Sequence, residues 1–360
     1  MKQPMVCITG GHLTPGLAVI EEIQRRNLSW KLVFIGRSHA FEGGGSPTYE
    51  ERLVKSLGAV FYALVTGRFQ RSWSPFTFFS LLKVPIGVIQ AFLFLLRYRP
   101  TVVLSFGGYI ALPVVIAAWV LKIPVITHEQ TEDLGLANRI IARFARRVLL
   151  ARESGVPLRH TLFDPPAQSS FAVDTKHPLL YITGGSTGAQ SLNALVFAII
   201  AELVKTYTVI HQVGVSDVSK ARLVKESLSQ DLRSRYMVAE YFDHLDLAWI
   251  YLHASLLIGR AGANTTAEAA ALGVPAVFIP LPWAAGNEQT RNAQKLASHG
   301  MAVVLEQDNL TGEALLHHIN DMMCTIGQYK KAAEAVAKQY PRNGAANVIK
   351  EIERIIPVFS

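Results

Sequence analysis

The chain has 360 residues, 50% of them hydrophobic and only 17% charged, which is enough apolar material for two domains and excludes a wholly disordered protein. Its net charge of +8 indicates an anionic partner, but no run of five Lys or Arg and no nucleic-acid-binding motif occurs, so nucleic acid is not expected. Cys7 and Cys324 allow at most one disulfide, and the first apolar run is too short for a signal peptide, so we expect a reduced, cytoplasmic protein.

Short β-branched runs alternate with helical stretches from end to end. They predict strands at residues 5–9, 32–35, 60–63, 102–104, 125–127, 148–150, 179–183, 208–211, 236–239, 256–259, 276–279 and 302–305. This alternation predicts an α/β protein with two Rossmann-like, doubly wound domains that face a cleft. We expect domains at 1–162 and 179–340, a proline- and serine-rich linker at 163–178, and a helix at 341–360 that packs back on the first domain.

The first glycine loop follows the first predicted strand, and a near copy of it follows the seventh. Residues 6–12 read VCITGGH and residues 180–186 read LYITGGS. A strand that turns through glycines into a helix points backbone N–H groups outward, which favours a bound phosphate. The alternative is that the glycines only make a tight turn, but two copies at domain spacing indicate two similar halves.

A long apolar run, FTFFSLLKVPIGVIQAFLFLL at residues 76–96, has arginines on both sides: Arg68, Arg71, Arg97 and Arg99. Its length matches a membrane span, although Lys83, Pro85 and Gln90 interrupt it. A core-facing helix and an arginine-rimmed surface that binds anionic lipid are both better interpretations, and we slightly favour the lipid-binding surface.

The sequence GRAGANTTAE at residues 259–268 directly follows a predicted strand. Its small residues permit close approach of a ligand, and Asn264, Thr265 and Thr266 fall where the next helix begins. Glu268 falls one turn further on, where it can accept hydrogen bonds from a ribose diol. The alternative is a capping box, with Thr265 as the helix cap and Glu268 three residues later.

Several further motifs accompany these loops: SFGGY at 105–109, HEQ at 128–130, GGSTGA at 184–189, HQ at 211–212 and NEQTRNA at 287–293. Together with residues 259–275 they resemble the bacterial peptidoglycan glycosyltransferases that add N-acetylglucosamine to lipid I and form lipid II. The resemblance runs from Thr9 to Ala293. It implies a GT-B fold and an inverting, metal-independent hexosyltransferase that needs no cofactor and acts in cell-wall synthesis.

The resemblance also implies roles for individual residues. His12 would be the general base for the acceptor hydroxyl, although it could instead cap the helix that begins near Pro15. The acceptor would be held by Thr9, Gly10, Gly11, Tyr109, His128 and Glu129. The UDP-sugar would be held by Ser186, Gly188, Phe242, Ala263, Asn264, Thr265, Glu268, Glu288, Gln289, Arg159 and Thr131. The implied partners are UDP-N-acetylglucosamine, lipid I and an anionic membrane surface, with a peripheral location at the cytoplasmic face of the cell membrane.

The sequence departs from the family pattern in three places. The first loop has one glycine pair fewer, Thr131 stands where the family usually has asparagine, and Glu288 stands where glutamine is common. The last two concern sugar recognition, so a glycolipid synthase that transfers a hexose from a UDP-sugar to diacylglycerol stays an alternative. A UDP-N-acetylglucosamine epimerase shares the architecture but would need no acceptor. A non-catalytic binding subunit is disfavoured because both glycine loops occur in one chain.

Overall fold

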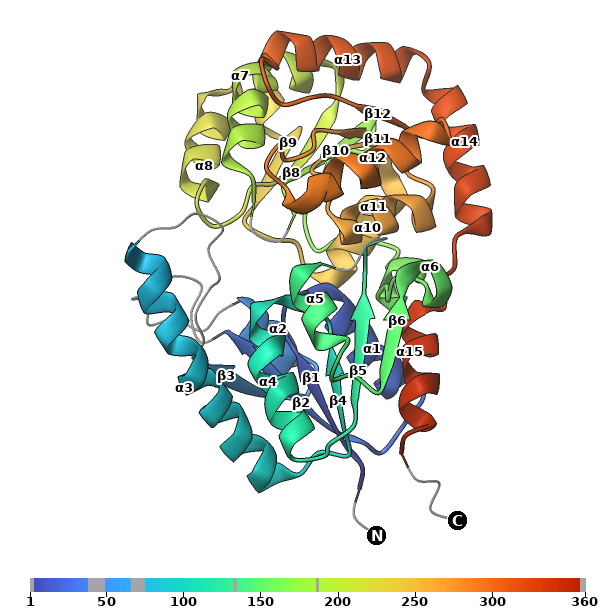
Figure 1. Cartoon of the computed structure of the whole chain (residues 1–360). Helices are drawn as coiled ribbons and strands as arrows, with labels where there is room; N and C mark the ends of the chain where they lie inside the picture. The colour runs from blue at the N-terminus through green and yellow to red at the C-terminus, as the bar shows by residue number, and fades with distance from the viewer. Residues whose placement is uncertain (1–2, 38–48, 66–74, 132–134, 186–187, 357–360) are drawn as a thin grey trace. The chain divides into compact units, whose positions relative to one another are not determined.

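The computed structural model describes residues 3–37, 49–65, 75–131, 135–185 and 188–356. The chain forms two compact units (Figure 1). Unit 1 contains Met1–His160 and Pro341–Ser360, and unit 2 contains Thr161–Tyr340.

Unit 1 is built on a parallel sheet of six strands in the order β3-β2-β1-β4-β5-β6. The strands are β1 Met5–Thr9, β2 Lys31–Arg37, β3 Val60–Leu64, β4 Val102–Ser105, β5 Val125–Glu129 and β6 Arg147–Leu150. The helices are α1 Leu13–Arg25, α2 Tyr49–Ser56, α3 Pro75–Tyr98, α4 Gly108–Val120, α5 Leu136–Ile141, α6 Ala151–Ser154 and α15 Gly344–Glu353. The central strand β1 is apolar on both sides, because Val6 and Ile8 pack with α1 and α15 while Cys7 packs with α3 and α4.

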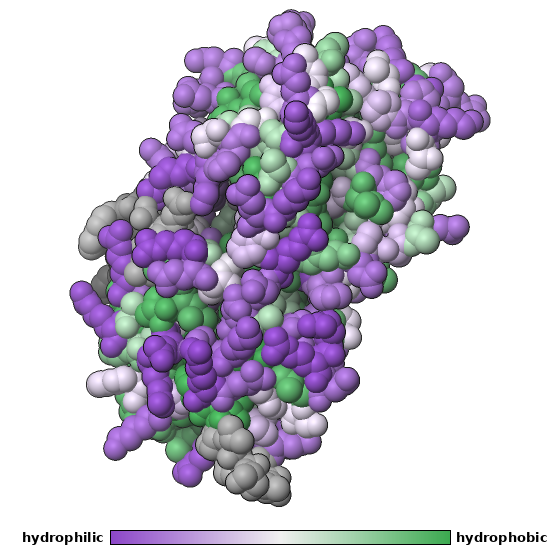
Figure 2. Space-filling model, turned by 90° about the vertical axis from the view of Figure 1, so that its right-hand side faces the viewer, coloured by the Kyte–Doolittle hydropathy of each residue, from purple (hydrophilic) through white to green (hydrophobic). Residues whose placement is uncertain are grey.

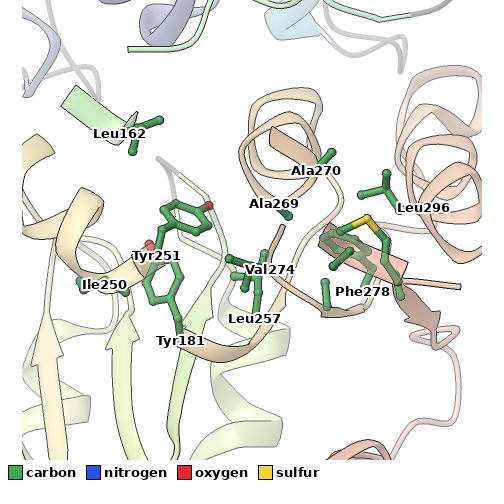
Figure 3. Close-up of a cluster of buried hydrophobic side chains, with 14 of the residues drawn as sticks. Leu162, Tyr181, Ile250, Tyr251, Leu257, Ala269, Ala270, Val274, Phe278 and Leu296 are labelled. Atoms are coloured by element: carbon green, nitrogen blue, oxygen red, sulfur yellow. The ribbon is translucent and has the colours of Figure 1, made fainter. Parts of the chain in front are cut away.

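Unit 2 repeats this architecture with the strand order β12-β11-β10-β7-β8-β9. Its strands are β7 Leu179–Thr183, β8 Thr208–Gln212, β9 Tyr236–Ala239, β10 Ala254–Gly259, β11 Ala276–Phe278 and β12 Ala302–Val304. Its helices are α7 Gln190–Thr206, α8 Val218–Ser227, α9 Gln230–Arg233, α10 His244–His253, α11 Ala263–Leu272, α12 Glu288–Ser298, α13 Gly312–Cys324 and α14 Ile326–Gln339, with short 3-10 turns η1 His160–Phe163 and η2 Ala285–Asn287. One of its two buried clusters is drawn in Figure 3.

The predicted fold class is confirmed, and each of the twelve predicted runs falls on a strand. Residues 163–178, predicted to be a linker, lie in unit 2, where the Phe171 ring packs against Phe242 with centroids 5.5 Å apart. Ser170 donates from its backbone N to Asp246 Oδ1 at 2.8 Å. The C-terminal helix α15 lies in unit 1, where Val348 and Ile352 are fully buried beside α1.

The apolar run at 76–96 lies within α3, whose side chains are described from Pro85 onward. One side of this part is buried and includes Ala91, Phe94 and Leu95. The opposite side exposes Ile86, Ile89, Leu93 and Leu96, with Arg97 and Arg99 near the helix end. Arg68 and Arg71 lie outside the described residues. Over the described ranges, every helix is too short or too polar to cross a bilayer.

A different face of the molecule, drawn in Figure 2, shows hydrophilic side chains between its hydrophobic areas. Along α3, Ile86, Ile89, Leu93 and Leu96 are exposed, while Gln90 is half-buried and accepts from the Val65 N at 3.0 Å.

Candidate active site

Both sheets have a point at which the connections change direction. In unit 1 the chain leaves β1 towards β2 and later returns to place β4 on the other side of β1. In unit 2 the same reversal occurs between β7 and β10. Doubly wound sheets bind their ligands at the carboxyl ends of strands beside such a switch point. The loops after β1, β4, β7 and β10 are therefore the candidate binding loops, and they carry the glycine motifs.

The helices after these four strands begin without a side-chain cap. Their N-cap residues are His12, Gly107, Ala189 and Gly262, and none makes a capping hydrogen bond. None of the four has an acidic residue in its first turn either. By contrast, the Asp243 carboxylate caps α10 and the Thr311 hydroxyl caps α13. The free N–H groups of an uncapped helix attract an anion, so each unit presents two adjacent helix ends suited to phosphate.

The glycines of unit 1 are required by close packing of two loops. A Cβ on Gly11 would lie 1.9 Å from the Gly107 carbonyl oxygen, and one on Gly108 would lie 2.9 Å from the Gly11 Cα. The Gly10 N–H donates to Ile35 O at 2.7 Å, which fixes the first loop to β2. Gly11 and His12 remain exposed at the end of this loop, and Tyr109 is half-buried in the first turn of α4.

The carboxylate of Glu129, at the end of β5, is almost fully buried and held by four donors. Oε1 accepts from the Thr131 backbone N at 3.1 Å and from its hydroxyl at 2.8 Å. Oε2 accepts from the Gly135 N at 3.1 Å and from Asn138 Nδ2 at 2.8 Å. This arrangement stabilises a fixed negative charge. Thr131, predicted to contact the donor sugar, has its hydroxyl directed to this carboxylate.

Two predicted acceptor residues carry buried polar atoms that have no hydrogen-bond partner among the described residues. His128 Nε2 donates to Gly155 O at 3.0 Å, which leaves Nδ1 as an acceptor, and Nδ1 has no hydrogen bond. The Thr9 hydroxyl is also buried and unpaired. Desolvation lowers the pKa of His128 to about 4, so this histidine is neutral at physiological pH. Buried polar atoms without a partner are uncommon in folded proteins, so both atoms can bond a polar group of a ligand.

His12 is an exposed residue at the N-cap position of α1, as the capping alternative requires, but its side chain makes no capping hydrogen bond to a described residue. Although the residue is accessible to solvent, the protein packed around its imidazole partly desolvates the ring and lowers its pKa below the ordinary value of 6.5, while the negative charge of Glu129 opposes this shift. The neutral form, which can accept a proton, is therefore favoured at physiological pH.

In unit 2, α11 begins at Ala263 with Gly262 as its N-cap, so Thr265 is not a cap and the capping-box alternative is wrong. Asn264 Oδ1 is buried and has no hydrogen-bond partner in the part of the chain that the structure describes. Glu268 lies further along the helix, 7% exposed, and its Oε2 accepts a 2.8 Å hydrogen bond from the Tyr251 hydroxyl. The carboxylate that the sequence assigns to ribose binding is thus held by a side chain from another helix.

Arg260 is a buried cation next to these loops. It follows β10 directly, is 5% exposed, and donates to Ile279 O at 2.7 Å and to Ser191 Oγ at 2.6 Å. It also donates to Gln307 Oε1. These partners are all neutral oxygens, and burial lowers the pKa of the guanidinium. Since Ser191 lies in the first turn of α7, the positive charge of Arg260 adds to that of the uncapped helix end.

Gln212, at the end of β8, links the second glycine loop to Phe242. Its Nε2 donates to Thr183 Oγ1 and Gly185 O, each at 3.3 Å, and its Oε1 accepts from the Phe242 N at 3.3 Å. Gly188 closes the loop with a φ of +73°, and a Cβ there would lie 2.5 Å from the Val213 carbonyl oxygen.

The remaining predicted donor residues are in different surroundings. Gln289 Oε1 accepts from the Leu281 N at 3.0 Å, beside Glu288 at the start of α12. Arg159 lies in unit 1, where its Nε donates to Glu21 Oε1 at 2.8 Å and its Nη2 bonds the same oxygen. Ser186 lies outside the described residues.

The sequence indicated neither Asn138 nor Tyr251, although each holds a predicted site carboxylate. Asn138 lies in α5 and Tyr251 in α10, and neither belongs to a recognisable motif. Gln212 and Arg260 lay within the quoted motifs but had no role assigned. No three His, Cys, Asp or Glu side chains gather as a metal site in the stretches that the structure describes.

Comparison with known proteins identifies the family. The glycosyltransferase family 28 N-terminal domain matches residues 5–150, and the glycosyltransferase family 28 C-terminal domain matches residues 179–352. A Tolumonas auensis protein named UDP-N-acetylglucosamine–N-acetylmuramyl-(pentapeptide) pyrophosphoryl-undecaprenol N-acetylglucosamine transferase is 34% identical and covers 99% of this chain and 100% of its own. A Treponema pallidum protein of the same name is 32% identical to this chain, and the alignment covers 97% of this chain and 94% of that protein.

A solved structure agrees with these relatives. The crystal structure of Acinetobacter baumannii MurG superposes with a TM-score of 0.67 at 26% identity, covering 98% of this chain and 100% of that one. The resemblance inferred from the motifs is confirmed. The chain is a glycosyltransferase of family 28 and belongs to the family of UDP-N-acetylglucosamine–N-acetylmuramyl-(pentapeptide) pyrophosphoryl-undecaprenol N-acetylglucosamine transferases.

Proposed function

We propose that this enzyme transfers N-acetylglucosamine from UDP-N-acetylglucosamine to lipid I, undecaprenyl-diphospho-N-acetylmuramoyl-pentapeptide, and so forms lipid II for peptidoglycan. The observation that carries the proposal is the pair of uncapped helix ends in unit 2, beside the buried cation of Arg260 and the held carboxylate of Glu268. A nucleoside diphosphate offers the matching chemistry, because its phosphates are anionic and its ribose carries two adjacent hydroxyls.

Unit 2 would hold the donor. The diphosphate would bind at the starts of α7 and α11, with Ser186, Gly188, Ala263, Asn264 and Thr265 around it. Glu268 would accept from the ribose hydroxyls, and the backbone of Phe242 would face the uracil. Glu288 and Gln289 would contact the sugar. The helix ends and Arg260 would stabilise the negative charge that develops on the departing UDP.

Unit 1 would hold the acceptor and supply the base. Thr9, Gly10 and Gly11 would bind the acceptor diphosphate at the start of α1. His12, neutral because its pKa is lowered, would take the proton from the acceptor hydroxyl as that oxygen attacks the anomeric carbon and UDP leaves. A single displacement inverts the anomeric configuration. The fixed charge of Glu129 would stabilise the imidazolium that forms.

A peripheral position at the cytoplasmic face of the membrane fits this acceptor, whose diphosphate is linked to a long isoprenoid chain. The exposed Ile86, Ile89, Leu93 and Leu96 of α3, together with Arg97 and Arg99, combine apolar area with positive charge. Surfaces of this composition bind anionic lipid. Exposed Trp119 and Val120 at the end of α4, which packs against α3, would extend the contact.

The direct test is incubation of the purified chain with UDP-N-acetylglucosamine and a lipid I analogue, followed by mass analysis. We expect an acceptor heavier by one N-acetylhexosamine, together with UDP, and the same yield in excess EDTA. Parallel reactions contain UDP-glucose or UDP-galactose with diacylglycerol, and UDP-N-acetylglucosamine without acceptor. Hexosylated diacylglycerol would favour the glycolipid synthase, epimerised UDP-sugar would favour an epimerase, and restoration by Mg²⁺ after EDTA would contradict metal independence.

A further inference from the structure

Tyr251 and Glu268 form a buried pair within unit 2. The Tyr251 hydroxyl donates to Glu268 Oε2 at 2.8 Å, and the two residues are only 2% and 7% exposed. Tyr251 lies in α10 and Glu268 in α11, so the bond joins two helices across 17 residues of sequence. A hydrogen bond to a carboxylate out of water is among the stronger ones in proteins.

The surroundings of Tyr251 leave its hydroxyl little freedom. Its ring packs edge-on against Tyr181 of β7, with centroids 5.5 Å apart and the planes at 77° (Figure 3). The two rings lie in the apolar cluster that also contains Leu257, Ala269 and Val274. Burial and the negative charge of Glu268 raise the pKa of Tyr251 well above its ordinary value, so the hydroxyl stays protonated and acts as a donor.

A glutamate side chain has three rotatable bonds and would otherwise sample several directions. A hydroxyl fixed by packing at one carboxylate oxygen removes much of that freedom, so less conformational entropy is lost when a ligand binds. The donor is an uncharged hydroxyl that occupies one lone pair of the carboxylate, so Glu268 can accept further hydrogen bonds.

We propose that Tyr251 is a positioning residue that holds the Glu268 carboxylate for the 2′- and 3′-hydroxyls of the nucleotide ribose and thereby sets the preference for ribonucleotide donors. The proposal rests on the proposed function, in which Glu268 binds the ribose. It assigns the sugar specificity of the nucleotide site to a residue that touches no part of the ligand.

The test compares Tyr251→Phe with the unmodified enzyme by calorimetric titration with UDP and with 2′,3′-dideoxy-UDP. The unmodified enzyme is expected to bind UDP at least about 10-fold more tightly than the dideoxy analogue. Tyr251→Phe is expected to weaken UDP binding by about 10-fold while changing dideoxy-UDP binding less than about 2-fold. The preference for ribose would then nearly vanish, although the ring and its packing remain.

Tyr207→Phe is the matched control, because the Tyr207 hydroxyl is also hydrogen-bonded, to Asn320 Oδ1 at 2.9 Å, and the residue is only 6% exposed. It should leave both affinities unchanged. If Tyr251→Phe weakens the binding of both ligands equally, Tyr251 has a general packing role and the proposal is overturned. The proposal is also overturned if the variant changes neither affinity, because the ratio of UDP affinity to dideoxy-UDP affinity then stays the same.

Glycosyl transfer by the unmodified enzyme separates the two levels of failure. If the unmodified enzyme transfers the sugar and Tyr251→Phe keeps the same ratio of UDP affinity to dideoxy-UDP affinity, only the positioning role is wrong. If the unmodified enzyme binds UDP and dideoxy-UDP equally, the ribose role of Glu268 fails as well.

Discussion

Asn138 Nδ2 donates a 2.8 Å hydrogen bond to Oε2 of Glu129, and the same amide group packs against the glycine loop after β4, where a Cβ on Gly107 would lie 2.6 Å from it. The pair joins the end of β5 to the glycine loop that follows β4. Asn138 and Glu129 are each only 4% exposed, so water could not readily replace this hydrogen bond if it were removed.

Asn138→Ala should therefore destabilise the protein and reduce turnover. Loss of a buried bond to a carboxylate is expected to lower the free energy of unfolding by about 1–3 kcal/mol, measured by urea denaturation. Asn343→Ala is the control, since Asn343 is exposed and makes no capping bond. Unchanged stability of Asn138→Ala would show that Glu129 does not depend on this donor.

His12→Ala should lower kcat by about 10²–10⁴-fold, the usual contribution of a general base, with UDP affinity nearly unchanged. Because the pKa of His12 is lowered, the acidic limb of the kcat/KM profile should lie below pH 6.5. Glu129→Gln removes the charge that raises this pKa and should move the limb to still lower pH. His299→Ala, an exposed histidine in unit 2, serves as control. Near-normal turnover of His12→Ala would remove His12 from the mechanism.

Arg260→Met should weaken UDP binding by about 10-fold but leave uridine binding nearly unchanged, because the lost charge acts on phosphate and not on the nucleoside. Arg260→Lys, which keeps the charge without the planar guanidinium, should recover part of the affinity. Calorimetry with both ligands gives the comparison. Equal losses for UDP and uridine would mean that Arg260 only holds Ser191 and Gln307 in place.

His211 should make unit 2 sensitive to acid. It is fully buried, donates to or accepts from Tyr236 and Asn193, and desolvation lowers its pKa to about 3. Below pH 6.5 the unfolded chain binds a proton at this residue while the folded chain does not, until the pH reaches about 3. The stability present above pH 6.5 is therefore lost as pH falls, by up to about 1.4 kcal/mol per pH unit.

His211→Gln should reduce that loss. Between pH 6.5 and 5, the free energy of unfolding should fall by about 1–2 kcal/mol less in the variant than in the unmodified protein. Urea denaturation at the two pH values measures the difference. An identical pH dependence would show that His211 does not contribute to acid sensitivity.

The apolar row of α3 should mediate membrane binding. Ile89→Ser with Leu93→Ser should reduce sedimentation with phosphatidylglycerol vesicles, leave UDP affinity unchanged, and leave a salt-sensitive residual binding through arginine. Leu223→Ser is the control, because Leu223 is 66% exposed on α8 of unit 2. If the unmodified protein ignores anionic vesicles, the row has another role.

The strands and the glycine loops were predictable because their signal is local. An apolar, β-branched run followed by glycines specifies both a buried parallel strand and its turn, so the strands of the described residues and the positions of the two glycine loops could be predicted from the sequence. The partners of the site residues did not. Asn138 and Tyr251 reach Glu129 and Glu268 only through tertiary packing, and Arg159 meets Glu21 across 138 residues. The hydrophobic periodicity of the sequence carries no information on such contacts between distant residues.

The order of synthesis bears on how unit 1 matures. Val348, Ile349 and Ile352 of α15 complete the apolar layer that contains Leu17 and Ile20 of α1, yet they leave the ribosome after all of unit 2. While unit 2 is being synthesised, and until α15 follows it, the apolar side chains of α1 that α15 covers in the folded protein therefore stay exposed. Chaperone binding or aggregation at that stage would depend on these exposed side chains of α1. A chain terminated at residue 340 would expose them permanently.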